Sequence, residues 1–507
     1  MAEPHIPTSS HPFTAALREP STVATQEDRG HPSQLVATLQ AQLLEAERRQ
    51  EALEQEVDAM LQKMRRGDIR LGLRLIKAAL GRQFRNTTIG GLLSRMRGGG
   101  RGKTSDTDCR ALADSIRRHS GKLIVVFPII PWEFRWQRPQ HIVSRLRDHG
   151  YSCWYLDMEL VPCRRNLNAA GESVTLRRLS TDVTEVGLRP KGAVNLYMDR
   201  LEGDDLSNVA AQLASLIAAT EPTSVHYLVQ FPGWWPLVET LKRSFGGTLI
   251  FDCMDDHGGF STKTYHALSA ERTLIRRADL VVASSAVLEE RCLALNPRTI
   301  RVRNGTEFDH FHNAQRNGSL DDYAVKPIVG YYGAIAEWFD AELLAYCAGK
   351  RPDWNFVLIG STVGANIKPL QGLSNVLLLG EKPYANLPGY FAYFDVCVIP
   401  FKIIPLTLAT NPVKFYEYVS AGKPVVSVRL PELEPYEQDC YLASGADEFL
   451  ARLDKAMAER HDTRLIARRI ELARENSWDA RVEALLKTTA FEGLPSASLG
   501  SPNEAGM

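Results

Sequence analysis

Lys414 and Glu417 are the residues whose types and spacing point most directly to ligand chemistry. They lie in the segment TNPVKFYEYVSAGKPVV, where Asn411 can cap a helix, Pro412 fits its first position and Gly422 can end it. A helix N-terminus can bind a diphosphate, and Lys414 would add a full positive charge there. Glu417, one turn further, would accept hydrogen bonds from ribose hydroxyls. The alternative is a surface ion pair, which does not explain a lysine where the helix dipole disfavours one.

The loop after the apolar run 122–127 holds a second group of side chains suited to binding. It contains Trp132, Arg135, Trp136 and Arg138. Tryptophan rings can stack on a sugar, and arginines can clamp anionic groups. The alternative is that both tryptophans pack in a hydrophobic core.

Three aspartates follow the apolar run TLIF, where their side chains should reach the edge of a sheet. These are Asp252, Asp255 and Asp256, and the last two can equally cap the helix that follows. Their spacing is not that of a D-x-D metal site, and the cysteines form no CxxC pair and no cluster with histidine. The sequence therefore predicts no metal site, and the scattered cysteines suit a reducing cytosol.

Short apolar runs alternate with helical stretches along most of the chain. The first group lies at 122–127, 151–157, 193–199, 224–231, 248–254 and 280–284. The second group lies at 327–333, 355–360, 375–380, 396–401 and 424–428. This α/β pattern predicts two doubly wound parallel sheets, with ligands bound at the carboxyl ends of their strands.

The predicted division of the chain follows from these patterns. Two Rossmann-like domains are expected at 122–312 and 313–470, followed by a C-terminal helix at 471–490. Tails without periodicity, at 1–32 and 491–507, are expected to be disordered.

A heptad repeat of apolar residues from Val36 to Met64 predicts a coiled coil within residues 33–66. It would join two copies into a homodimer through residues 36–64, and a single amphipathic helix lying on the rest of the protein is the alternative. The segment 67–121 mixes Leu and Ile with Arg and Lys, as an interfacial helix on anionic lipid would. A solvated connector is the alternative there.

Charge and hydrophobicity limit the partners and the location. The 60 Lys and Arg balance the 60 Asp and Glu, so the net charge does not point to nucleic acid. The N-terminus lacks the basic and apolar regions of a signal peptide, and no apolar run approaches the roughly 20 residues of a spanning helix. We expect a cytoplasmic protein with peripheral contact on the inner face of the cell membrane.

Several segments resemble GT-B glycosyltransferases. ATNPVKFYEYVSAGKPVV resembles the donor-binding helix of family 4, and YYGAIAEWFD, VLIGS and LLLGEKPYANLPGYFAYFDVCVIPF follow the same layout. FPIIPWEFRWQRPQHIVSRL resembles the start of a bacterial subgroup that makes surface polysaccharides, including teichuronic-acid-type enzymes. FDCMDDHGGF, ERTLIRRADLVVASSAVLEER and VRNGTEFDHF come next in the expected order.

The resemblance implies a GT-B fold whose second domain binds a nucleotide-diphosphate sugar and whose first domain binds the acceptor. It places Lys414 at the diphosphate and Glu417 at the ribose. It places Tyr384 and Leu387 at the base, while Gly333 permits close approach of the backbone to the donor. The donor is a substrate, and neither a cofactor nor a metal ion is implied.

Two departures from the family pattern concern the sugar end of the site. Ala409 stands where the E-x7-E pattern has its first glutamate, and Thr410 or Asn411 is expected to substitute for it. Glu337 and Asp340 stand in the loop where family members often place an arginine and a lysine. The sugar and the stereochemical course therefore stay open.

An inverting reaction would need a general base to deprotonate the acceptor hydroxyl. Asp256 is expected in that role, with His141 and Asp252 as the other candidates. The predicted function is transfer of a sugar to a glycan or lipid-linked glycan in surface polysaccharide synthesis. The alternatives are a non-catalytic scaffold, which Ala409 favours, and a sugar-nucleotide 2-epimerase of the same shape.

Overall fold

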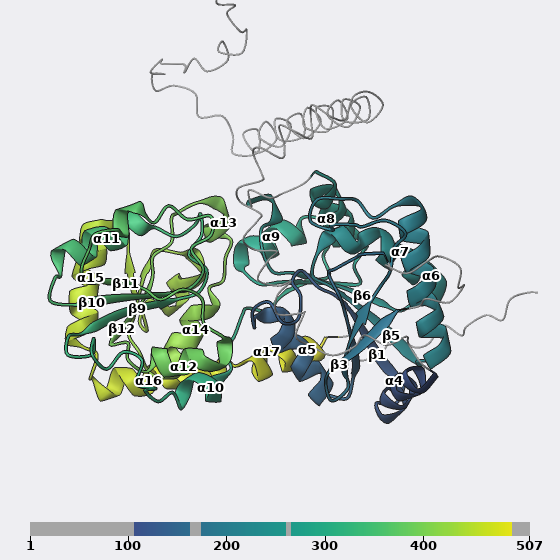
Figure 1. Ribbon diagram of the computed structural model, residues 1–507, viewed down its shortest axis with the longest axis horizontal. Coiled ribbons are helices and arrows are strands. Elements are labelled where there is room, and N and C mark those ends of the chain that lie inside the picture. The colour runs from purple at the N-terminus through teal and green to yellow at the C-terminus, as the bar shows by residue number, and fades with distance from the viewer. Residues whose placement is uncertain (1–105, 163–173, 260–264, 489–507) are drawn as a thin grey trace, which may run out of the picture. The chain divides into compact units, whose positions relative to one another are not determined.

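The computed structural model describes residues 106–162, 174–259 and 265–488, which all belong to one compact unit formed by residues 90–507 (Figure 1). Four predicted segments lie outside the described residues: the tails at 1–32 and 491–507, the coiled coil at 33–66 and most of the basic segment at 67–121.

The first domain is built on an eight-stranded sheet in the order β3-β4-β2-β1-β5-β6-β7-β8. Neighbouring strands are parallel except β3 and β4, and β1, β2, β5, β6 and β7 are buried at every residue or at all but the first. The strands are β1 (Lys122–Phe127), β2 (Ser152–Leu156), β3 (Thr175–Ser180), β4 (Val183–Gly187), β5 (Ser224–Val229), β6 (Thr248–Cys253), β7 (Leu280–Ala283) and β8 (Thr299–Arg301). The helices are α4 (Asp106–Arg118), α5 (Arg138–Asp148), α6 (Gly203–Thr220), α7 (Trp235–Phe245), α8 (Tyr265–Arg277) and α9 (Ala286–Leu293).

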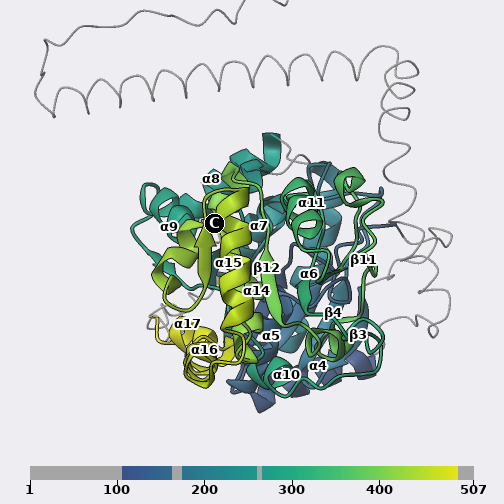
Figure 2. The ribbon, with the colours of Figure 1, turned by 90° about the vertical axis from the view of Figure 1, so that its left-hand side faces the viewer.

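The second domain is built on a six-stranded parallel sheet in the order β11-β10-β9-β12-β13-β14. The strands are β9 (Ile328–Tyr332), β10 (Asn355–Ile359), β11 (Val376–Leu378), β12 (Val396–Ile399), β13 (Val425–Val428) and β14 (Tyr441–Ala443). The helices are α10 (Phe308–His312), α11 (Ala341–Lys350), α12 (Leu387–Phe391), α13 (Pro405–Leu408), α14 (Val413–Ser420), α15 (Ala446–Ala458) and α16 (Thr463–Glu475). Helix α15 runs along one face of this sheet (Figure 2). The two predicted doubly wound sheets are thus confirmed.

The structure differs from the predicted strands in two ways. The run 193–199 forms a turn and not a strand, with a single β-bridge between Val194 and Leu160. Most of its side chains are exposed, so its apolar residues do not mark a core strand. Strands β3, β4, β8 and β14 are not among the predicted strands. Of these, β8 and β14 have only three residues each, β3 is a partly exposed, arginine-bearing edge strand, and β4 pairs with it.

The chain crosses between the domains at two adjacent places. Thr306, after β8, pairs in parallel with Ser477, and the N–H of Trp478 donates to the Thr306 carbonyl (3.0 Å). The segment predicted as a single helix, 471–490, is therefore divided: α16 ends at Glu475, and α17 (Trp478–Leu486) begins after it. Helix α17 packs on α5, and Trp478 is buried in the core of the first domain (Figure 1).

Candidate active site

A cavity of about 970 Å3 is lined by residues of both domains. Its wall includes the loops after β1 and β5 of the first sheet and after β9 and β12 of the second. In each sheet these two strands are neighbours from which the strand order runs outward in opposite directions. Doubly wound folds bind ligands at such switch points, and the volume is at the upper end of the range for small-molecule sites.

Helix α14 begins at this cavity, with Val413 and Lys414 on the cavity wall. Its N-cap is Pro412, so the prediction that Asn411 caps the helix is wrong. The reason is that the Asn411 side-chain amide is hydrogen-bonded to Asn304 and Glu432. Gly422 follows the helix with a φ of 70°, as the sequence predicts.

The Lys414 side chain lies over two aromatic rings at the cavity. Its Nζ is 5.5 Å from the ring centroid of Tyr331 and 5.7 Å from that of Phe401. Burial lowers the pKa of Lys414 from its ordinary 10.5 to about 8, while the Glu417 charge opposes this shift and the Arg135 charge adds to it. Among the described residues we find no carboxylate in an ion pair with Lys414. A bound anion would therefore stabilise its charged form.

Glycines at the ends of three neighbouring strands form a bare stretch of backbone beside Lys414. A Cβ on Gly333, which follows β9 with a φ of 130°, would lie 2.2 Å from the Lys414 Cε. A Cβ on Gly360, which follows β10 with a φ of 155°, would lie 1.8 Å from the Gly333 carbonyl oxygen. The Gly360 N–H donates to the carbonyl of Gly380, beyond β11 (2.9 Å). Glycine alone fits the first two positions, and a ligand can approach the backbone closely there.

Glu417 is buried on the cavity wall, with 5% of its surface exposed. Its Oε2 accepts a hydrogen bond from the Tyr332 hydroxyl (3.0 Å). Burial raises the pKa of Glu417 to about 7, although the Lys414 charge and the Tyr332 hydrogen bond oppose the shift. In the described part of the chain its Oε1 has no hydrogen-bond partner, so this oxygen is available to ligand hydroxyls.

Tyr384 and Leu387 also line the cavity. The Tyr384 ring stacks on His310, with centroids 4.5 Å apart, and lies 6.4 Å from the ring of Trp136 of the first domain. Its hydroxyl donates to Glu307 Oε2 (3.1 Å). Tyr384 therefore belongs to an aromatic contact between the domains at one end of the cavity.

Thr410 lies on the cavity wall, whereas its neighbour Ala409 does not. The Thr410 hydroxyl donates to the Leu406 carbonyl (2.7 Å) and keeps its capacity to accept a hydrogen bond. Ala409 is 3% exposed and packs in the core of the first domain. Its methyl group therefore packs against the first domain, at the position where the family pattern has a glutamate.

Arg138 and Asp252 form a buried ion pair in the first domain. The Arg138 Nη2 donates to Asp252 Oδ1 (2.7 Å), and its Nη1 donates to the Val302 carbonyl (2.9 Å) and to Asn304 Oδ1 (3.2 Å). Although Arg138 borders the cavity, it is 3% exposed and its guanidinium group is occupied. The structure therefore brings this predicted binding residue and this predicted base together as a structural pair.

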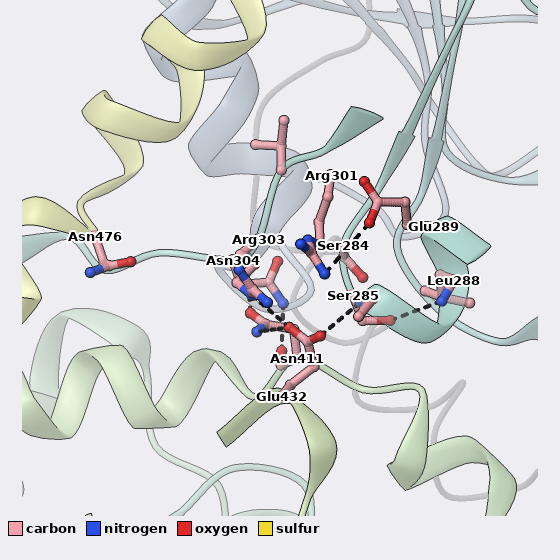
Figure 3. Close-up of polar contacts among 12 residues, drawn as sticks. Ser284, Ser285, Leu288, Glu289, Arg301, Arg303, Asn304, Asn411, Glu432 and Asn476 are labelled. Atoms are coloured by element: carbon pink, nitrogen blue, oxygen red, sulfur yellow. Dashed lines mark hydrogen bonds and ion pairs between the residues drawn. The ribbon is translucent and has the colours of Figure 1, made fainter. Parts of the chain in front are cut away.

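Through Asn304, a polar network continues from this pair into the second domain; Figure 3 shows its part around Asn304, Asn411 and Glu432. Asn411 Oδ1 accepts from the Asn304 N–H (3.0 Å), and Asn411 Nδ2 donates to Glu432 Oε2 (2.8 Å). Glu432 also accepts from Arg303 Nε (2.8 Å) and from the Ala286 N–H at the start of α9 (2.7 Å). The Asn411 side chain is thus committed to the domain contact. No sequence motif predicts the role of Glu432.

The loop after β1 places its aromatic and charged residues on the cavity wall. Trp132 and Trp136 pack edge to face with centroids 5.3 Å apart, and Trp132 is 8% exposed, which fits the packing alternative. Arg135 reaches the second domain, where its Nε lies 2.6 Å from Glu381 Oε1.

His141 is fully buried and does not line the cavity. Its Nδ1 accepts a hydrogen bond from Trp136 Nε1 (3.1 Å), and its ring stacks on Trp478 at 4.9 Å. Burial holds the pKa of His141 well below its ordinary value, so the ring is neutral at pH 7. The structure thus places it in the packing behind the site.

Asp255, and not Asp256, faces the cavity. Asp256 Oδ1 forms an ion pair with Arg291 (2.7 Å) and accepts from the Gly258 N–H (3.2 Å). Burial raises the pKa of Asp255 to about 7. The sequence shows two adjacent aspartates but not which one points inward, because both follow the strand in an irregular loop.

The described residues contain no group of three or more histidine, cysteine, aspartate or glutamate side chains arranged to hold a metal ion. None of their helices has the length and apolar character needed to cross a membrane.

Comparisons with known proteins agree with the resemblance. Residues 326–459 match the family model described as glycosyl transferases group 1. A putative teichuronic acid biosynthesis glycosyltransferase, TuaH of Bacillus subtilis (strain 168), is 26% identical over 321 residues, which are 58% of this chain and 79% of that protein.

Solved structures are similar in fold at low identity. Sucrose-phosphate synthase from Thermosynechococcus elongatus has a TM-score of 0.55 and 15% identity, covering 72% of this chain and 97% of that one. An E. coli trehalose-6-phosphate structure with bound UDP-2-fluoro glucose has a TM-score of 0.54 and 14% identity, covering 74% of this chain and 100% of that one. The predicted GT-B fold is confirmed.

Proposed function

We propose that this chain, a glycosyltransferase with the GT-B fold, transfers a sugar from a nucleoside diphosphate to a glycan or lipid-linked glycan of a cell-surface polysaccharide. The B. subtilis relative, described as a teichuronic acid biosynthesis glycosyltransferase, supports the acceptor class. The bound UDP-2-fluoro glucose in a structure of the same fold supports the donor class.

The observation that carries this proposal is the Lys414 side chain at the start of α14. It is a cation with a pKa lowered to about 8, beside glycine backbone and open cavity. Free N–H groups at the helix N-terminus add to its attraction for phosphate. We therefore assign the diphosphate to Lys414 and Gly333, and we expect turnover without a metal ion.

The remaining donor contacts follow from the wall on either side of Lys414. Glu417 has one free carboxylate oxygen for ribose hydroxyls, and Tyr384 and Leu387 border the space for the base. Of the two candidates near the sugar, Thr410 alone has an uncommitted hydrogen-bond acceptor.

On the acceptor side, the wall of the first domain includes Trp132, Trp136 and Asp255. We assign the general base to Asp255 for an inverting reaction. Its carboxylate would take the proton of the acceptor hydroxyl while that oxygen attacks the anomeric carbon and the nucleoside diphosphate leaves toward Lys414. A pKa of about 7 suits a base that works at neutral pH.

A thermal-shift screen with nucleoside diphosphates tests the donor site. A ligand at 100 times its dissociation constant stabilises the folded state by about 2.7 kcal/mol. Lys414→Ala should abolish this gain, whereas Lys423→Ala, at a lysine outside the cavity wall, should keep it. An unchanged gain in Lys414→Ala would remove Lys414 from the site, and acceptor-independent isomerisation of the sugar would point to an epimerase.

We also propose that the predicted basic segment at 67–121 docks the enzyme on anionic lipid, and that residues 36–64 make it a dimer. Helix α4 packs on the first domain through Leu112 and Ile116, so a truncated variant should begin near Thr104 to keep that helix. Sedimentation with anionic vesicles should pull down the full chain and not this variant. Equal partitioning would exclude the lipid contact.

A further inference from the structure

We infer that Arg135 leaves Glu381 and binds the donor diphosphate together with Lys414, so that residues of both domains hold the donor. This inference rests on the proposed function. Arg135 belongs to the first domain, which the proposed function assigns to the acceptor. The inference gives this residue a role in binding the donor.

The Arg135–Glu381 ion pair joins the two domains at the edge of the cavity, with a distance of 2.6 Å between Nε and Oε1. Its side chains are 27% and 48% exposed. Exposed ion pairs contribute little to stability, so an anionic ligand can exchange for Glu381 at small cost.

Gly380, Gly360 and Gly333, at the ends of neighbouring strands, lie between this ion pair and Lys414. Glu381 directly follows Gly380, whose carbonyl bonds to Gly360, and Gly360 touches Gly333 beside Lys414. Strands β9 and β11 are two strand spacings apart, about 10 Å. Gly333 and Gly360 line the cavity together with Arg135 and Lys414, and neither glycine carries a side chain that would keep a phosphate group away.

The charges of the cavity wall favour Arg135 as the second cation. A diphosphate in a sugar nucleotide carries two negative charges, and Lys414 supplies one positive charge. Arg138 is occupied by Asp252, which leaves Arg135 and Lys382 as the two further cations of the wall, and Lys382→Ala is the variant that tests the second of them. A guanidinium group is suited to phosphate because it can donate two parallel hydrogen bonds.

Further support comes from the electrostatic coupling of the two cations. Burial lowers the pKa of Lys414 and raises that of Tyr331, the ring beneath it; the Arg135 charge adds to the first shift and opposes the second. Arg135 is thus close enough to act on the place assigned to the phosphates. In the second domain, the loop after β9 contains the acidic residues Glu337 and Asp340 and no lysine or arginine that could bind the second phosphate group.

Calorimetric titration of the full chain tests the exchange. The probes are UDP, GDP, ADP and dTDP with the corresponding monophosphates. The variants are then titrated with the diphosphate that binds and with its monophosphate. Arg135→Ala should weaken diphosphate binding at least tenfold and monophosphate binding less than threefold. Glu381→Gln should strengthen diphosphate binding about threefold, because it removes the competing carboxylate. Arg178→Ala, at an exposed arginine outside the cavity wall, is the matched control and should change neither.

The double variant separates exchange from a static domain contact. With Arg135→Ala already present, Glu381→Gln should have no further effect. If Glu381→Gln weakens binding as Arg135→Ala does, the ion pair itself is required and the inference is overturned. An unchanged diphosphate preference in Arg135→Ala, or its loss in Lys382→Ala instead, overturns it too. Absence of binding by every diphosphate to the unaltered chain would refute the proposed function itself.

Discussion

Replacing Lys414 by methionine should stabilise the free enzyme while abolishing its response to donor. The side chain is cationic, half-buried and without an ion pair among the described residues. In the absence of a bound anion, this partly buried charge lowers the free energy of unfolding of the protein. Methionine has a similar length without the charge. It should therefore remove both the destabilisation of the free enzyme and the binding of the donor diphosphate.

The magnitude follows from the lowered pKa. The fall from 10.5 to about 8 corresponds to about 3 kcal/mol of unfavourable free energy for the charged form in the folded state. Two effects reduce the gain: water in the cavity, and loss of the cation–π contacts with Tyr331 and Phe401. We expect Lys414→Met to be more stable by about 1–2 kcal/mol at pH 7.

The pH dependence has a definite sign. Between pH 8 and 10.5 the folded protein with Lys414 binds fewer protons than the unfolded chain, so its stability rises with pH. The advantage of Lys414→Met should therefore be full below pH 8 and vanish near pH 10.5.

Urea unfolding at pH 7 and 9.5, with and without nucleoside diphosphate, measures both effects. Lys423→Met serves as the control, because Lys423 also has a pKa lowered by burial but lies outside the cavity wall. It should keep the stabilisation by ligand. A Lys414→Met protein that is less stable than the parent at pH 7, or that still responds to ligand, would refute the reasoning.

Three further variants test other parts of the site. Glu432→Ala should cost about 3–5 kcal/mol in urea unfolding because it leaves buried donors and a charge unpaired, whereas Glu434→Ala, at an exposed glutamate, should cost less than about 0.5. Gly333→Ala should lose donor binding in calorimetry, since its Cβ would collide with the lysine beside it; Gly349→Ala, where nothing lies within 4 Å, should bind normally. Asp255→Asn should reduce turnover at least 100-fold and remove the rise of activity through pH 7; a pH profile identical in shape to the parent would exclude it as the base.

The sequence predicts the elements of the site better than the direction of its side chains. A helix start after a buried strand is a local pattern, so the sequence points to Lys414 and Glu417, and both line the cavity. The prediction names Asp256, whereas Asp255 lines the cavity, because loop geometry decides which of two adjacent aspartates points inward. Asn411 does not cap the helix, because its side chain is hydrogen-bonded to a residue more than a hundred positions away.

Contacts across long sequence distances account for the other differences. The pairing of Arg138 with Asp252 and the bond from Glu432 to the start of α9 each join segments that no periodicity relates. Short strands such as β8 and β14 give too few residues for a pattern. The fold class is robust to such omissions, because the longer buried strands already define both sheets.

The return of α17 to the first domain has a consequence for biosynthesis. Trp478 and Leu485 fill the core of a domain whose last strand, β8, precedes the entire second domain in the chain. During translation, domains generally fold as they emerge from the ribosome, N-terminal first. Here the core of the first domain cannot be completed until nearly the whole chain has been made, and the apolar site that Trp478 fills stays exposed until then. Premature termination within the second domain would thus leave the first one incomplete and prone to aggregation.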